Sequence, residues 1–321
     1  MRVVTAADLA QVFTYPAVIE ALRTAFVTPV VTPVRHHHPV ERAGEPNAML
    51  LLMPAWSDLS TSVGDGAVLG VKIVSVIPGN AGRALPSVVG AYVLFDGITG
   101  APLAVMDGAV LTLWRTASAS ALAAGYLARK DAGTLLMVGS GALAPHLVKA
   151  HCAVRPIRDV MIWNRRLEKA ETLAAELVAE GVPARATADL EPAARNADVI
   201  SCATLSAEPI IRGEWLRPGA HLDLVGGFTP GMRETDDTAI RRASVFVDTL
   251  AGATKEAGDI TQPLASGALG RDAIHGDLFG LCAGSVPGRT HADEITLFKS
   301  VGTAIEDLAA ARLAAELIGL R

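Results

Sequence analysis

The sequence has few cysteines, few aromatic residues and no long uncharged apolar run. Its three cysteines are isolated, without C-x-x-C spacing, which indicates neither a disulfide framework nor a zinc site. No apolar stretch reaches the roughly 18 residues of a membrane-spanning helix. The N-terminus, with charges at Arg2 and Asp8, lacks the apolar core of a signal peptide. We therefore expect a cytoplasmic protein with no membrane partner.

The chain also lacks an excess of basic residues. Its net charge is −5 and its pI is near 5.9, which argue against a nucleic-acid partner. Hydrophobic residues make up 50% of the sequence, charged residues 19% and aromatic residues 4%, a composition typical of a globular protein with a large core. A length of 321 residues favours about two domains.

The hydrophobic pattern changes near residue 115. Residues 5–28 have the spacing of a helix. Residues 30–114 contain apolar segments separated by Gly, Pro and Asn, which predict strands. These strands are expected at Ala48–Met53, Gly70–Val76, Gly90–Asp96 and Ala101–Met106.

From Ala117 onward, helix-like and strand-like segments alternate. Alternation of this kind is typical of an α/β fold in which a parallel sheet carries helices on both faces. Glu294–Leu317 has apolar residues at helical spacing and predicts one long helix, which we expect to return to the first domain. The alternating segments are residues 117–127, 134–138, 142–153, 159–163, 167–180, 189–196, 198–203, 220–225 and 244–248.

A glycine pattern follows the first strand of this second region. The apolar segment that begins at Thr134 ends in Gly139-x-Gly141-x-x-Ala144, and a helix-like segment follows at once. Gly139 permits a tight turn, Gly141 allows the backbone to approach phosphates, and Ala144 is small enough for close helix–sheet packing. A dinucleotide pyrophosphate can bind backbone N–H groups in this context. A plain glycine turn would give the same triplet, and the next strand bears on the choice.

That next strand, Val160–Trp163, ends in Asn164, Arg165 and Arg166. The residue at this strand end normally faces the adenosine ribose, where a carboxylate binds the 2′-hydroxyl and an arginine accommodates a 2′-phosphate. Arginine pairs bidentately with phosphate. We therefore predict NADPH as the cofactor, with NADH as a weaker donor. The alternative is that these arginines are the solvated start of the helix at residues 167–180.

Three cations of the first region lie in otherwise apolar segments. They are Arg35 in Pro33–His38, Lys72 in an alternating strand, and Arg115 after an apolar run. Burying an unpaired cation is costly, so each marks either a surface position or an anion-binding pocket. Their occurrence together on one small domain favours recognition of a carboxylate.

Several segments resemble those of the ornithine cyclodeaminase/mu-crystallin family, in order and over almost the whole chain. The resemblance implies a homodimer with a substrate-binding and dimerisation domain at residues 1–116 and 296–321. It also implies a Rossmann-type doubly wound domain that binds NADP at residues 117–295, with the active site in the cleft between the domains. The segments that carry the resemblance are Ala101–Ser120, Gly70–Lys72, Gly139–Gly141, Cys202–Ser206, Pro230–Glu234 and Glu294–Gly302.

The resemblance also implies roles for individual residues. Arg35, Lys72 and Arg115 match residues that hold the substrate carboxylate and neighbouring groups, and Val301 completes the substrate wall. No metal is expected, because successive histidines of the His36–His38 tract would alternate faces of a strand. The cofactor-binding positions are Ser87, Arg115, Gly139, Gly141, Ala142, Leu143, Asn164, Arg165, Arg166, Thr204, Val225 and Ser300.

One position departs from the family pattern. Cyclodeaminases and the related alanine dehydrogenases carry an aspartate where Val225–Gly231 has Phe228. A phenyl ring cannot take a proton from an amine, as deamination requires. A preformed cyclic imine needs only to be held and to receive hydride, so positioning supplies most of the catalysis. The segment resembles that of the ketimine reductase branch, which implies catalytic roles for Lys72, Arg115 and Phe228.

We therefore expect NADPH-dependent reduction of Δ1-pyrroline-2-carboxylate to L-proline and of Δ1-piperideine-2-carboxylate to L-pipecolate. Two alternatives remain open at this point. One is an ornithine cyclodeaminase or an alanine-dehydrogenase-like enzyme on the same scaffold. The other is a non-catalytic, NADPH-binding, crystallin-like protein.

Overall fold

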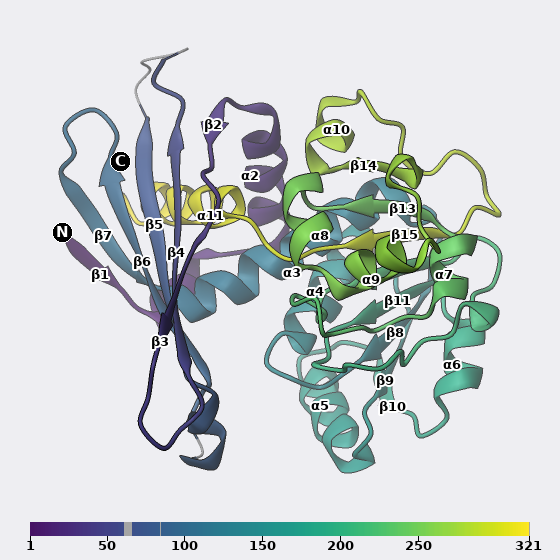
Figure 1. The fold of residues 1–321 in the computed structure, drawn as a ribbon. Helices are drawn as coiled ribbons and strands as arrows, with labels where there is room; N and C mark the ends of the chain where they lie inside the picture. The colour runs from purple at the N-terminus through teal and green to yellow at the C-terminus, as the bar shows by residue number, and fades with distance from the viewer. Residues whose placement is uncertain (61–65, 84, 321) are drawn as a thin grey trace. The chain divides into compact units, whose positions relative to one another are not determined.

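The protein is represented by a computed structural model, which describes residues 1–60, 66–83 and 85–320 (Figure 1). The chain divides into two compact units. Unit 1 comprises Met1–Thr116 and Thr303–Arg321, and unit 2 comprises Ala117–Gly302. Within the described ranges, no helix is long and apolar enough to cross a membrane.

Unit 1 is a mostly antiparallel sheet with helix α11 (Ala304–Leu317) packed on one face (Figure 1). The strand order is β1-β7-β6-β5-β4-β2, and β3 also pairs with β4. Helices α1 (Ala6–Val12) and α2 (Tyr15–Val27) precede the sheet, and α2 packs against α11. The strands are β1 (Arg2–Val4), β2 (Val30–Val31), β3 (His36–Val40), β4 (Ala48–Ser57), β5 (Val68–Val76), β6 (Val88–Asp96) and β7 (Pro102–Asp107).

Both faces of this sheet are largely apolar, but only one of them is buried. Side chains alternate between faces along a strand, so directly paired residues form rows across the sheet. Lys72 is the single charged member of a buried row that continues through Tyr92. The adjacent row, on the opposite face, is apolar and is not buried. The buried row is Val4, Met106, Tyr92, Lys72 and Met53, and the uncovered row is Val3, Val105, Val93, Val71 and Pro54.

Unit 2 contains an eight-stranded sheet in which every strand pair is parallel. Its order, β10-β9-β8-β11-β12-β15-β13-β14, reverses direction between β8 and β11, as in a Rossmann fold. The predicted fold class is therefore confirmed. The strands are β8 (Thr134–Val138), β9 (Asp159–Trp163), β10 (Ala184–Ala186), β11 (Val199–Cys202), β12 (His221–Leu224), β13 (Ser244–Val247), β14 (Ile274–Asp277) and β15 (Thr296–Lys299).

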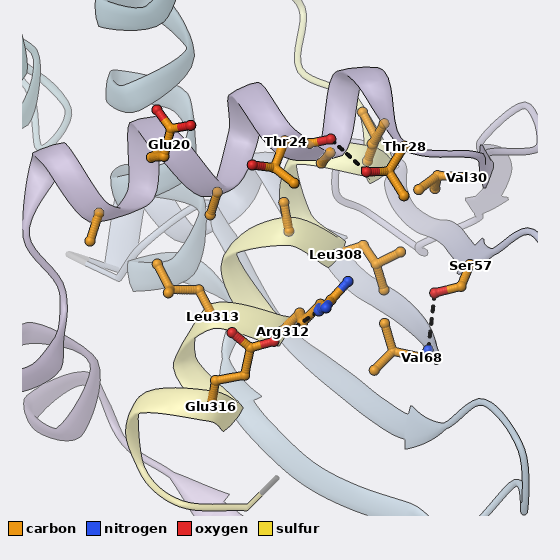
Figure 2. Close-up of a pocket in the computed structure, with 15 residues that line it drawn as sticks. Glu20, Thr24, Thr28, Val30, Ser57, Val68, Leu308, Arg312, Leu313 and Glu316 are labelled. Carbon is orange, nitrogen blue, oxygen red and sulfur yellow. Dashed lines mark hydrogen bonds and ion pairs between the residues drawn. The ribbon is translucent and has the colours of Figure 1, made fainter. Parts of the chain in front are cut away.

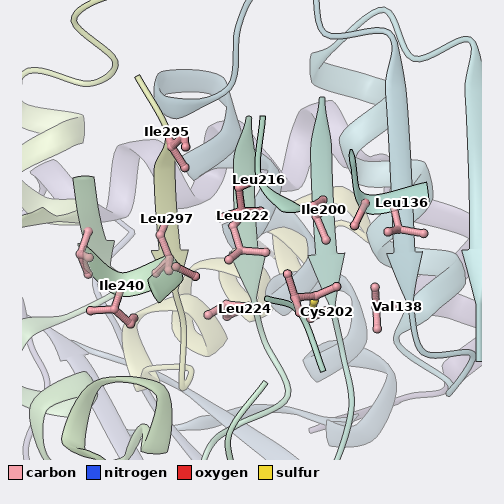
Figure 3. Packing of buried hydrophobic residues seen from close by; sticks show 14 of the residues in the cluster. Leu136, Val138, Ile200, Cys202, Leu216, Leu222, Leu224, Ile240, Ile295 and Leu297 are labelled. Carbon is pink, nitrogen blue, oxygen red and sulfur yellow. The ribbon is translucent and has the colours of Figure 1, made fainter. Parts of the chain in front are cut away.

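Helices connect these strands, and α3 (Gly108–Leu127) leads into the unit. Buried aliphatic residues from neighbouring strands pack beside one another (Figure 3), including Leu136, Ile200, Leu222 and Leu297. Nearly continuous apolar strands are typical of a parallel sheet that is covered on both faces. The helices are α4 (Ala144–Val154), α5 (Leu167–Ala179), α6 (Leu190–Asn196), α7 (Asp237–Arg242), α8 (Leu250–Glu256), α9 (Gly258–Ser266) and α10 (Leu278–Ala283).

Two predicted helices were wrong in extent. The helix predicted at 5–28 is divided into α1 and α2, because Thr14 caps a new helix and Pro16 lies in its first turn. The helix predicted at 294–317 begins only at Ala304, and Thr296–Lys299 is instead strand β15 between β12 and β13. A fully buried four-residue run cannot be distinguished from a helical turn by periodicity. The compact unit consequently ends at Gly302 rather than at residue 295.

Candidate functional site

The glycine loop of unit 2 has the geometry of a phosphate-binding turn. Gly139 has a φ of 110°, and a Cβ at this position would lie 2.7 Å from the carbonyl oxygen of Ala203. Nothing lies within 4 Å of the Cβ position of Gly141, so the backbone is open to a ligand there. Helix α4 follows without a side-chain cap at Leu143. The N–H of Ala144 bonds to the carbonyl oxygen of Gly141 at 2.9 Å, and Pro145 has no N–H, so an anion here would be held by N–H groups of the loop that precedes the helix.

A cavity of about 550 Å³ lies beside this loop. It is bounded by the ends of β8, β9 and β11, where ligands of doubly wound sheets bind. Asn164 donates to Ser140 Oγ at 2.7 Å and accepts the N–H of Arg166 at 3.0 Å, which fixes the end of β9 against the loop. The described lining contains two arginines and no carboxylate: it is Gly139–Gly141, Trp163–Arg166, Ala203–Ser206 and Ile210.

Six of the twelve predicted cofactor positions thus line one cavity: Gly139, Gly141, Asn164, Arg165, Arg166 and Thr204. Ala142 and Leu143 continue the loop into α4, and Val225 is buried at the end of β12. Ser300 follows β15, and its buried Oγ has no hydrogen-bond partner among the described residues. Ser87, in unit 1, accepts the N–H of Ile77 through its carbonyl oxygen.

Asp248 holds the loop that contains Val301, a contact that the sequence did not suggest. Its Oδ2 accepts the N–H groups of Val301 and Gly302, both at 2.7 Å. Burial raises the pKa of Asp248, and these N–H groups lower it. The loop therefore stabilises the ionised carboxylate, and the carboxylate in turn holds the loop. Gly302 has a φ of 79°, a conformation that favours glycine.

The second candidate region is a buried ion cluster in unit 1. Lys72 and Arg115 are 2% and 5% exposed. Lys72 Nζ lies 2.8 Å from both carboxylate oxygens of Asp307 and 3.4 Å from Thr112 Oγ1. Arg115 donates through Nε to Asp307 at 2.9 Å and through Nη1 to Glu306 at 2.6 Å. Asp307 therefore bridges the two cations.

The charges of this cluster determine what Lys72 can do. Burial, followed by the charge of Arg115, lowers the pKa of Lys72 to about 8, against the opposing effect of Asp307. The charge of Arg35 lowers it further, which brings all three predicted cations into one electrostatic environment. Arg115 stays charged, because Asp307 and Glu306 raise its pKa despite its burial. Lys72 is thus an acid that can exchange a proton near neutral pH.

The structure shows how these cations are paired. Lys72 lies in the covered row of the sheet and contacts Asp307 on α11. Asp107, which is close to Arg115 in sequence, instead accepts through Oδ1 the N–H groups of Ala109 and Val110 at the start of α3. The partners of Lys72 and Arg115 are Glu306 and Asp307, two adjacent buried acids on α11. That unusual pair was the available signal.

The remaining predicted residues have simpler environments. Phe228 is 44% exposed and follows Gly226 and Gly227 after β12. His36–His38 are exposed on β3. In the parts of the chain that the structure describes, no group of three or more His, Cys, Asp or Glu side chains could hold a metal ion.

A second cavity, of about 420 Å³, lies between α2 and α11 (Figure 2). Apart from Glu20 and the Arg312–Glu316 ion pair, its lining consists of small or aliphatic residues. Ile305 and Leu308 face this cavity, whereas the intervening Glu306 and Asp307 contact the ion cluster. One helix therefore separates an apolar groove from the charged groups.

Comparisons with known proteins agree with this geometry. Residues 3–318 match the model of the ornithine cyclodeaminase/mu-crystallin family. A Δ1-pyrroline-2-carboxylate reductase from Colwellia psychrerythraea is 37% identical over 320 residues, which are 98% of this chain and 99% of the relative. The Thermococcus litoralis Δ1-pyrroline-2-carboxylate reductase, solved with NADH and L-proline, superposes with a TM-score of 0.91 at 34% identity, covering 99% of this chain and 97% of that one. An archaeal alanine dehydrogenase dimer with bound NAD gives a TM-score of 0.88 at 29% identity, covering 99% and 95%.

Proposed function

The chain belongs to the ornithine cyclodeaminase/mu-crystallin family, and we propose that it is a nicotinamide-dependent reductase of cyclic ketimine carboxylates. Its substrates are Δ1-pyrroline-2-carboxylate, reduced to L-proline, and Δ1-piperideine-2-carboxylate, reduced to L-pipecolate. The relatives that carry the first of these names support the reaction class. One observation favours reduction over deamination: Phe228, which the family resemblance places where deaminating members carry an aspartate, is an exposed phenyl ring with no proton-accepting group.

The ion cluster of unit 1 supplies the chemistry that a ketimine acid requires. Arg115 has a terminal nitrogen, Nη2, that makes no hydrogen bond to the described part of the chain, so it can bind the substrate carboxylate with Arg35. Lys72 supplies the proton that the ring nitrogen needs, and Asp307 orients the ammonium. A bound nicotinamide supplies the hydride to the imine carbon.

NADPH is the proposed cofactor, although similar proteins have been solved with NADH or NAD. The glycine loop fits a pyrophosphate, and the cavity has Arg165 and Arg166 where NAD-binding folds place a carboxylate. Replacing both arginines by alanine is expected to raise the Kd of NADPH roughly 10–100-fold, because charge-assisted bonds to the 2′-phosphate are lost. The Kd of NADH should change little.

Fluorescence of the bound nicotinamide measures both constants. Lys169→Ala is the matched control, since it removes an exposed cation from α5 that does not line the cavity. Equal weakening of NADPH and NADH in the double variant would show that the arginines do not select the phosphate.

We also propose that the protein is a homodimer whose partner covers the uncovered apolar row of unit 1, and that it is cytoplasmic. An antiparallel sheet with two apolar faces exposes a continuous hydrophobic patch, which is typical of an interface. Val71→Asp, between Val93 and Pro54 in this row, is expected to raise the dimer dissociation constant at least ~30-fold. Light scattering measures it, with the exposed turn variant Ile98→Asp as the control. A monomeric wild-type protein would contradict the proposal.

The reaction itself is tested with a small substrate panel. NADPH oxidation is followed with both cyclic ketimine acids, and ammonia release is followed with ornithine and with alanine in the presence of NADP or NAD. We expect turnover of the ketimines and none of the amino acids. Ammonia release at a comparable rate would favour a cyclodeaminase or an alanine-dehydrogenase-like enzyme. Binding of NADPH without oxidation by any ketimine would favour a crystallin-like protein.

A further inference from the structure

Three charged side chains are fully buried where β11 and β12 end in unit 2. They are Glu234, Asp259 and Lys299. Glu234 Oε1 accepts both the N–H and the hydroxyl of Thr204, at 2.7 and 2.9 Å. Its other oxygen accepts the N–H of Gly226 at 2.8 Å. One carboxylate therefore ties together the segments that follow two neighbouring strands.

Asp259 bonds to the backbone of Glu234, and Lys299 lies beside Asp259. Asp259 Oδ1 accepts the N–H of Glu234 at 2.8 Å, and its Oδ2 lies 3.3 Å from Lys299 Nζ. A Cβ on Gly227 would lie only 2.5 Å from that same Oδ2. The glycine pair that precedes Phe228 is thus in direct contact with the cluster.

Gly226 is packed closely against both Thr204 and Glu234. A Cβ on Gly226 would lie 2.0 Å from the carbonyl oxygen of Thr204 and 2.4 Å from Glu234 Oε1. Thr204 in turn lines the cavity that contains the glycine loop. A change in Glu234 therefore acts directly on Thr204, because Glu234 bonds to both the backbone N–H and the hydroxyl of that residue.

The cluster holds two acids against one cation. Burial and the charge of Asp259 raise the pKa of Glu234 to about 7, although Lys299 and the bonds from Thr204 lower it. The other titratable group that faces it is Cys202 on β11, a neutral thiol whose pKa is raised by burial and then by Glu234. Protonation of Glu234 removes acceptor capacity from a carboxylate that bonds to the backbone N–H groups of Thr204 and Gly226, which can only donate.

We propose that Glu234 is a positioning residue for the nicotinamide half of the cofactor, and that its carboxylate form holds Thr204 and the Gly226–Phe228 segment in the binding conformation. Affinity for NADPH then follows the ionisation of Glu234. This inference rests on the proposed function, because it takes the Thr204 side of the cavity as the place of the nicotinamide.

The experiment measures the Kd of NADPH by its fluorescence, at pH values below and above 7, for wild type and for Glu234→Gln. The amide preserves the shape but turns an NH₂ toward an N–H donor. In wild type, Kd is expected to rise roughly 10–100-fold as pH falls through about 7. In the variant, NADPH should bind weakly, with a Kd that does not depend on pH in this range.

Glu294→Gln is the matched control. Glu294 is also nearly buried, and its Oε2 likewise accepts the N–H and the hydroxyl of one threonine, Thr290, at 2.6 and 3.1 Å. It does not line the cavity, so the control variant should lose stability but retain the Kd and its pH dependence.

The outcomes separate this inference from the proposed reaction. Tight, pH-independent binding by Glu234→Gln would overturn the inference even if the wild type reduces ketimines. Conversely, a wild type that shows the pH step in Kd but reduces no ketimine would overturn the reaction and leave the inference standing. If Glu234→Gln does not fold, the wild-type titration decides, because a flat Kd across pH 7 overturns the inference.

Discussion

Replacing Lys72 by methionine is expected to lower kcat for ketimine reduction by roughly 10²–10⁴-fold, the usual contribution of a general acid. Methionine fills a similar volume in the buried row of the sheet but has no proton to give. Lys72→Arg keeps the positive charge beside Asp307, yet a guanidinium does not release its proton near neutral pH. It should therefore retain a near-normal KM for the ketimine while kcat stays low.

The pH profile separates a proton donor from a structural cation. The pKa of Lys72 is about 8, so its acid form predominates below that pH. We expect wild-type kcat/KM to fall as pH rises through about 8 and this limb to be missing from Lys72→Met. The exposed Lys130→Met serves as the control and should leave both rate and profile unchanged. A Lys72→Met enzyme within a few-fold of wild type would remove Lys72 from the mechanism.

The sequence was most informative where function depends on neighbouring residues. The glycine loop and the start of α4 are contiguous in the chain, and the end of β9 follows in the same strand–helix–strand unit, so their spacing predicted one cofactor cavity. The parallel sheet was predictable because alternating helices and strands leave few topologies. The family resemblance, which the comparisons confirm, fixed the order of the remaining segments.

The sequence was least informative where charges meet across the fold. Lys72 and Asp307 are 235 residues apart, and no local pattern relates a strand residue to an acid in the last helix. Glu234 lies within a segment that carries the family resemblance. Its proposed role, however, depends on its contacts with Thr204 and Gly226, which follow strands β11 and β12. The carboxylates therefore escaped prediction, whereas the cations were found from their unusual apolar contexts.

Asp307→Asn is expected to affect both stability and catalysis. Asp307 is fully buried and bonds to both Lys72 and Arg115, so its neutralisation leaves two buried cations facing each other. Breaking a buried ion pair in this way typically costs about 3–5 kcal/mol of unfolding free energy. Calorimetry or denaturant unfolding measures that loss.

The catalytic effect of the same change follows from the sign of the charge. Asp307 raises the pKa of Lys72, which burial and Arg115 lower, so without the carboxylate the ammonium loses its proton at lower pH. The alkaline limb of kcat/KM should move from about 8 to a pH at least roughly one unit lower, with a corresponding loss of activity at neutral pH.

Glu306→Gln tests whether Asp307 acts on the chemistry or only on the fold. Glu306 pairs with Arg115 at 2.6 Å and is equally buried, whereas Asp307 is the carboxylate that contacts Lys72 Nζ at 2.8 Å. It should destabilise the protein to a similar degree while the limb remains near 8. If both variants shift the limb equally, the cluster acts as a single charge and Asp307 has no special role. If only Asp307→Asn shifts it, the Asp307 carboxylate sets the proton affinity of Lys72, the proposed proton donor.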